Sequence, residues 1–115
     1  MPKPEPIEEG AAFDLKQIEE EMRREPVFER TGRTARTLVR TEDLRLVFVV
    51  LTSGNQIEEH HASQAVSIHV VRGSVALQLP ARSVELGEGQ VLVLDRELRH
   101  DVQAHEDSAF LLTLG

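Results

Sequence analysis

The feature that most constrains the fold is a series of short apolar runs that starts near residue 34 and continues to the C-terminus. The runs are rich in Val, Leu and Thr, and turn signals such as Ser53-Gly54-Asn55 and Pro80-Ala81 separate them. Strands of this length and spacing predict an all-β fold, an antiparallel sandwich or barrel. The expected strands are residues 34–40, 44–52, 65–72, 75–79, 83–86, 91–95, 101–104 and 109–114.

One of these runs differs from the others. The residues Val91-Leu92-Val93-Leu94 are all apolar, whereas a half-exposed strand alternates apolar and polar residues. A strand that is apolar on both faces is usually covered on both faces. We therefore expect this run to have no solvated face.

The N-terminal segment has a different pattern. Residues 1–12 are rich in Pro, Glu and Gly, which predicts a flexible arm. Apolar residues then recur at helical spacing and predict a short helix over residues 15–24, which Asp14 caps and Pro26 ends. The expected organisation is a flexible arm at 1–12, a helix and linker at 13–33, and a single β domain at 34–115.

Composition narrows the classes of function. The chain has 115 residues, 40% of them hydrophobic, which fits one domain with one core. Its net charge of -7 disfavours nucleic-acid binding, which takes clustered Lys and Arg. It has no cysteine, so disulfides, thiolate metal ligands and a Cys nucleophile are excluded. The apolar runs are far shorter than the roughly 20 residues of a membrane span, and no signal segment is apparent, so we expect a cytoplasmic protein without membrane contact.

Two glycine–histidine spacings carry the chemistry of the chain. In the first, Gly54 is followed by five residues and then His60, and Gly73 closes the next strand. In the second, Gly89 precedes the apolar run at 91–94, and His100 follows it. This layout resembles the two motifs of the cupin family. The resemblance spans about residues 35–114 and implies an antiparallel double-stranded β-helix, the cupin jelly-roll barrel, behind a short N-terminal α-helix.

The chain departs from both cupin motifs at several positions. Ala62 and Val66 stand where the first motif has its second histidine and its glutamate. In the second motif Asp95 replaces the proline, Glu97 the glycine and Ala104 the asparagine. The changes in the first motif make the barrel mouth less charged and more apolar, which suits a neutral or partly apolar ligand.

The two histidines are the leading site candidates. In the cupin family both point into the barrel mouth from adjacent strands, so the resemblance assigns His60 and His100 to the site. Neutral imidazoles bind divalent transition metals, here Zn, Fe, Mn, Ni or Cu, but a stable site usually takes three or more protein ligands. His61 would be a third ligand only if a bulge turned it inward, because strand alternation places it opposite His60. The alternative is a hydrogen-bonded polar pair that contacts a ligand without a metal.

Four other polar residues complete the set of candidates. Gln64 and Glu58 have the same alternation parity as His60, which makes Gln64 a candidate ligand contact and Glu58 a candidate acidic ligand. For Glu58, a solvated loop carboxylate is the favoured interpretation. His69 is expected on the outer face of its strand, at the surface or at an interface. His105 is expected in an exposed turn.

Three functions are compatible with these residues. The first is a small-molecule-binding cupin without a tightly held metal, in which His60, Gln64 and His100 orient the ligand. The second is a metal-dependent enzyme, an oxygenase or isomerase acting on a small polar metabolite. The third is a metal-free acid/base enzyme of the epimerase type, which the absence of tyrosine disfavours. As a small cupin, the chain is expected to form a homodimer through edge strands, with a contribution from the N-terminal arm.

Overall fold

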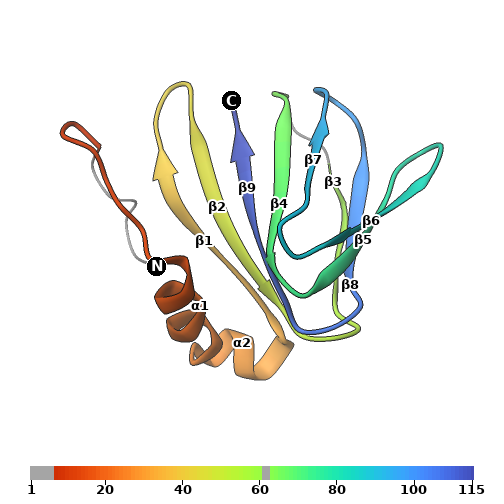
Figure 1. Cartoon of the computed structure of the whole chain (residues 1–115), viewed down its shortest axis with the longest axis horizontal. Helices are drawn as coiled ribbons and strands as arrows, with labels where there is room; N and C mark the ends of the chain where they lie inside the picture. Colours follow the sequence, from red (N-terminus) through yellow and green to blue (C-terminus); the bar gives the residue numbers. More distant parts are fainter. Residues whose placement is uncertain (1–6, 61–62) are drawn as a thin grey trace.

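The fold is a pair of antiparallel β-sheets (Figure 1). The computed structural model describes residues 7–60 and 63–115, with the backbone alone at residues 59 and 60. One sheet has the strand order β1 (Arg33–Arg40), β2 (Arg45–Leu51), β9 (Ser108–Leu114), β4 (Val66–Arg72) and β7 (Val91–Leu94). The other has the order β3 (Gln56–His60), β8 (His100–Ala104), β5 (Ser74–Gln78) and β6 (Ser83–Gly87). This arrangement confirms the all-β antiparallel fold.

The main hydrophobic core lies between the two sheets. Alternate residues of each strand point into it, as the period of two along a strand requires. In β4 these residues are Val66, Ile68 and Val70, each at most 5% exposed. Phe110 is the one aromatic residue of this core, and aliphatic side chains fill the remainder. The other buried members are Val47, Val49, Leu51, Val75, Leu77, Leu86, Leu94, Val102 and Ala104.

The barrel has two different ends. Strands β3, β5, β7 and β9 finish at one end, where β4, β6 and β8 begin, and we call this end the mouth; it is the upper end in Figure 1. The opposite end, which we call the turn end, holds the short connections from β2 to β3, β4 to β5, β6 to β7 and β8 to β9. The motif glycines Gly54, Gly73 and Gly89 all lie at the turn end, one strand length from the mouth.

Two helices pack on the outer face of the five-stranded sheet (Figure 1). Helix α1 spans Leu15–Arg23, and the carboxylate of Asp14 caps it by accepting a hydrogen bond from the backbone N–H of Gln17 at 3.1 Å. Helix α2 spans Pro26–Thr31, where the sequence predicted a linker. The proline ends one helix and begins the next, because a first helical residue needs no N–H donor. Met22 and Phe28 bury themselves against the strands beneath.

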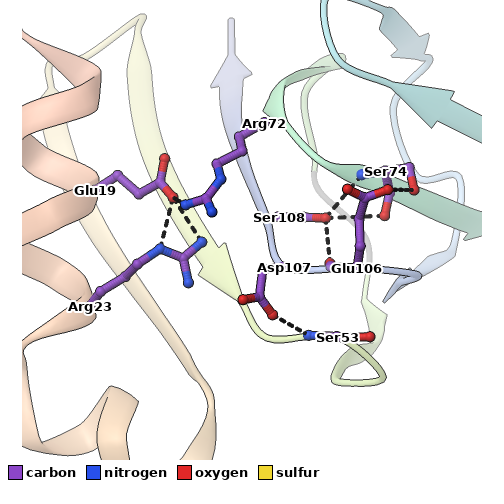
Figure 2. A network of polar contacts seen from close by, with 8 residues as sticks. All are labelled: Glu19, Arg23, Ser53, Arg72, Ser74, Glu106, Asp107 and Ser108. Carbon is purple, nitrogen blue, oxygen red and sulfur yellow. Dashed lines mark hydrogen bonds and ion pairs between the residues drawn. The ribbon is translucent and has the colours of Figure 1, made fainter.

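A buried carboxylate fixes α1 to the sheet. Glu19 is only 7% exposed, and its Oε2 accepts hydrogen bonds from Arg23 Nε in the same helix and from Arg72 Nη1 at the end of β4 (Figure 2). The hydrogen bond to Glu19 raises the pKa of Arg72 above its usual value, so the guanidinium stays charged. The ion pair therefore connects a helix to a strand that lies far away in sequence.

Close backbone packing explains one motif glycine at the turn end. Gly73 has φ of +81°, and a Cβ added there would lie 2.3 Å from the carbonyl oxygen of Asp107. Beside it, the fully buried hydroxyl of Ser108 accepts from Ser74 N–H at 3.1 Å and donates to the carbonyl of Glu106 at 2.7 Å (Figure 2). Only glycine fits both the conformation and the space.

Two strands differ from the sequence-based expectation. Strand β3 was not predicted from the sequence. Ile57 is its only apolar residue, whereas a strand is recognised from several apolar residues in one run. Strand β7 was expected to be covered on both faces, yet Val91 is 52% and Val93 is 67% exposed. Leu92 and Leu94 pack against the core, so one face of β7 is apolar and open within a single chain.

None of the helices in the described part of the chain is both long enough and apolar enough to cross a membrane.

Candidate functional site

His100 is a buried polar residue at the mouth. It is the first residue of β8 and is 3% exposed. Its Nδ1 lies 3.1 Å from the carbonyl oxygen of Leu98. Because a carbonyl can only accept, Nδ1 carries the proton in this contact. The Leu98 carbonyl thus sets both the orientation and the tautomer of the imidazole.

The loop before His100 contains a strained residue. Glu97 has φ of 65°, the only positive φ of a non-glycine residue in the described ranges 7–60 and 63–115. In the cupin motif this position is a glycine, so the backbone keeps the left-handed conformation although the residue type has changed. This conformation shapes the tight turn that carries Leu98 toward the imidazole of His100.

The register of β3 brings the second histidine position next to the first. Ile57 pairs with Val102, and His60 pairs with His100. The residues of the first strand are three apart and their partners only two apart, so β3 carries one extra residue, a β-bulge. In β8 the alternate residues His100 and Val102 are both buried. Because β3 has one extra residue, the position of His60, and not that of its neighbour, lies in the same cross-strand row as His100.

The bulge also changes the expectation for the neighbouring polar residues. The parity that grouped Glu58 with His60 assumed regular alternation, and this alternation is broken between residues 57 and 60. Glu58 is exposed and lines a surface pocket with Arg33 and Ile57. Glu58 therefore lies at the surface, in agreement with the favoured expectation of a solvated carboxylate rather than an acidic ligand.

The remaining candidates occupy different places. Gln64 is exposed between β3 and β4, and its Oε1 accepts a hydrogen bond from the Ser63 hydroxyl at 3.1 Å. His61 lies outside the described residues. His69 is half-buried on the outer face of β4, as predicted. His105 is exposed at the turn end and lies 3.2 Å from a carboxylate oxygen of Glu85, as expected for a turn histidine.

Comparisons with known proteins agree with this geometry. No protein-family model matches the sequence, and no curated protein matches it significantly. Solved structures do match. A cupin family protein with a double-stranded β-helix fold from Methanocaldococcus jannaschii is 20% identical, with a TM-score of 0.67 over 74% of this chain and 81% of that chain.

This chain has the cupin fold. The resemblance drawn from the motif residues is thereby confirmed at the level of the fold.

Two further structures that match this cupin differ in how much they cover. A conserved protein of unknown function from Streptococcus pyogenes is 23% identical, with a TM-score of 0.74 over 99% of this chain and 94% of that chain. The similarity therefore includes the helices as well as the barrel. A mutant of salicylate 1,2-dioxygenase from Pseudoaminobacter salicylatoxidans is 14% identical, with a TM-score of 0.79 over 89% of this chain but only 34% of that chain.

The described donors of this cupin do not make a tight metal site. Val66, at the position of the motif glutamate, is 5% exposed and packs in the core. Gln64 is exposed and already accepts a hydrogen bond. Among the side chains that the structure describes, those of residues 7–58 and 63–115, no cluster of three or more His, Asp or Glu is placed to hold a metal ion. His100 contributes one nitrogen, whereas a stable transition-metal site usually takes three protein ligands.

The sequence did not predict that apolar residues line a cavity at the mouth of the barrel. Leu79, Leu94 and Leu98 line a cavity of about 270 Å³ beside His100. One signal could have pointed to Leu98, because it is the single apolar residue in the charged segment from Asp95 to Arg99. An apolar residue in an otherwise charged loop usually packs inward or contacts a ligand.

Proposed function

We propose that this cupin binds a small organic molecule in its mouth and does not need a tightly held metal to do so. His100 is the polar anchor. Its buried ring, held by the Leu98 carbonyl, is the observation that carries the proposal. A buried imidazole in a fixed tautomer offers a directed hydrogen bond to a ligand.

The surroundings of His100 support this function. The position of His60 is the cross-strand partner of His100, and we propose that its imidazole contacts the same ligand. Gln64, exposed after β3, would contact the ligand from the rim of the mouth. Val66 supplies apolar surface where the cupin motif has a carboxylate. A small set of polar groups on an apolar wall is typical of small-molecule sites.

A metal-dependent oxygenase or isomerase is the alternative function. The fold similarity to a salicylate dioxygenase favours it. It would use His60 and His100 and would need a third ligand from His61 or Gln64. The metal would be one of Zn, Fe, Mn, Ni or Cu.

The test compares ligand and metal content in matched histidine variants. Untagged wild type, His100→Ala and His105→Ala are purified without chelator and analysed by native mass spectrometry and by metal analysis. The proposal expects a bound organic mass in the wild type that His100→Ala loses and His105→Ala keeps, because His105 lies at the turn end. About one equivalent of metal that only His100→Ala loses would establish the alternative instead.

We also propose a homodimer through the outer face of the five-stranded sheet. On this face, two rows of residues run across β2, β9, β4 and β7. Outside the part that the helices cover, these rows contain no Asp, Glu, Lys or Arg, although 29% of the chain is charged. An isologous contact brings each residue close to its own copy, so an uncharged patch avoids self-repulsion in a chain of net charge -7. A second copy would also cover the open face of β7. This outer strip consists of Leu46, Ser67, His69, Val91, Val93, Leu111 and Thr113.

A further inference from the structure

A second feature of the mouth points to the kind of ligand. The cavity of about 270 Å³ is lined by residues of the β5–β6 hairpin, of the end of β7 and of the loop that follows β7. Its inner wall is built from Leu79, Leu94 and Leu98, which pack against the inter-sheet core. Its exposed rim is formed by Pro80, Ala81, Arg82, Val93 and Asp95.

Two of the residues that line this cavity, Leu79 and Leu98, are neighbours of His100 in the fold. Leu98 lines the cavity, and its carbonyl accepts the Nδ1 proton of His100. Gln78 pairs with Asp101 in the antiparallel β5–β8 ladder, so the next residue of β5, Leu79, lies beside His100. A molecule that contacts His100 can therefore extend directly onto an apolar surface.

The charges of the rim select for an uncharged ligand. Six of the eight lining residues are apolar, and the two charged ones, Arg82 and Asp95, have opposite signs. Their charges offset each other for a ligand in the cavity, so neither an anion nor a cation gains a net attraction. The net charge of -7 disfavours anions further.

We propose that the cavity holds the apolar body of an uncharged ligand whose polar group contacts His100. This inference deepens the proposed function and rests on it. The cavity is slightly smaller than the roughly 300 Å³ at the lower limit of common ligand pockets, so the ligand has one or two rings, or an alkyl chain of similar volume.

The test fills the cavity from its rim and measures binding of an uncharged probe. N-phenyl-1-naphthylamine, which fluoresces in apolar surroundings, is titrated into the wild type, Ala81→Trp and Ala11→Trp. Ala81 is exposed on the hairpin, so a tryptophan there can occupy the cavity without disturbing the core. Ala11 is exposed near the N-terminus and receives the same side chain as a control.

We expect saturable binding to the wild type and to Ala11→Trp, and an affinity at least about tenfold lower in Ala81→Trp. Absence of saturable binding in the wild type, or equal affinity in Ala81→Trp, would overturn the proposal. A parallel titration with anilinonaphthalene sulfonate tests the charge class, because this probe has a similar body and a negative charge. Tighter binding of the sulfonate that Arg82→Gln removes would overturn the choice of an uncharged ligand.

The same experiment separates this inference from the proposed function. If the probe behaves as expected but His100→Ala keeps the native ligand, the cavity stands and the role of His100 fails. If His100→Ala loses the native ligand while Ala81→Trp leaves both native ligand and probe bound, the role of His100 stands and the cavity inference fails.

Discussion

Glu97 has a backbone conformation that usually belongs to glycine. With φ of 65° its Cβ is crowded against the backbone, and this strain costs the folded state free energy. The turn holds Leu98 where its carbonyl meets the imidazole of His100. Strain in a loop that positions a buried polar residue is common at binding sites, where the surrounding structure imposes the conformation.

We expect Glu97→Gly to stabilise the protein by about 0.5–1 kcal/mol, because glycine adopts this conformation without strain but loses more chain entropy on folding. The measurement is urea-induced unfolding. Arg96→Gly is the control and should destabilise the protein, because its φ is not positive and only the entropy loss remains. A lower stability of Glu97→Gly would mean that the side chain contributes more than its conformation costs.

The sequence predicted the position of His100 in the barrel better than it predicted the surroundings of His100. His100 was found from its spacing after a glycine and an apolar run, and that spacing reflects the length of one strand between the turn end and the mouth. The Leu98 carbonyl could not be predicted, because a backbone acceptor has no residue-type signature. The parity that Glu58 shares with His60 did not identify a ligand, because a bulge adds one residue between them and alternation cannot show where that residue is inserted.

Helix α1 is attached to the barrel by both apolar contacts and one ion pair. Met22, a residue of α1 that faces the sheet, is fully buried, and Glu19 connects the helix to Arg72 of β4. A buried carboxylate is tolerated only when its charge is paired and hydrogen-bonded. The position of α1 therefore depends on the contact between Glu19 and its two arginines.

We expect Glu19→Gln to destabilise the protein by about 1–3 kcal/mol, because it removes the charge that both arginines share. Glu20→Gln changes an exposed neighbour and should shift stability by less than about 0.5 kcal/mol. Urea unfolding gives the free energies, and hydrogen exchange of the α1 amides should show faster opening in Glu19→Gln alone. Equal exchange in both variants would contradict a role of Glu19 in holding the helix.

Strand prediction succeeded where strands are apolar and failed where they are not. Six of the nine strands in the described residues contain runs of Val, Leu or Ile that predict a strand directly, and the short strands β6 and β8 were predicted as well. Strand β3 is held by its ladder with β8 rather than by its own apolar residues. Helix α2 was missed because Pro26 marks both an end and a start.

At the scale of the whole molecule, the outer strip leaves an apolar surface open. Val91 and Val93 are exposed on one face of β7, next to His69 and Ser67 in the cross-strand rows. The sequence predicts a strand covered on both faces, whereas a single chain covers only one. The proposed second copy on the outer strip would reconcile the sequence pattern with the structure.

We expect Val91→Glu to convert a dimer into a monomer, because a two-fold contact would bring two unpaired carboxylates together in an apolar interface. Sedimentation velocity on wild type and variant measures the oligomeric state. Gln103→Glu adds the same charge at an exposed position of the four-stranded sheet and should remain dimeric. A wild type that sediments as a monomer at high concentration would rule out the dimer.

The separation of the two barrel ends has a practical consequence. At the turn end, the motif glycines have positive φ, and Ser74 and Ser108 are joined by hydrogen bonds. The exposed rim of the proposed cavity, in contrast, lies in short loops at the mouth. Loops on a rigid framework tolerate substitution far better than the framework does. Residues 80–82 and 95–96 can therefore be randomised as a library, and new binding specificities selected from it, while the turn end continues to direct folding.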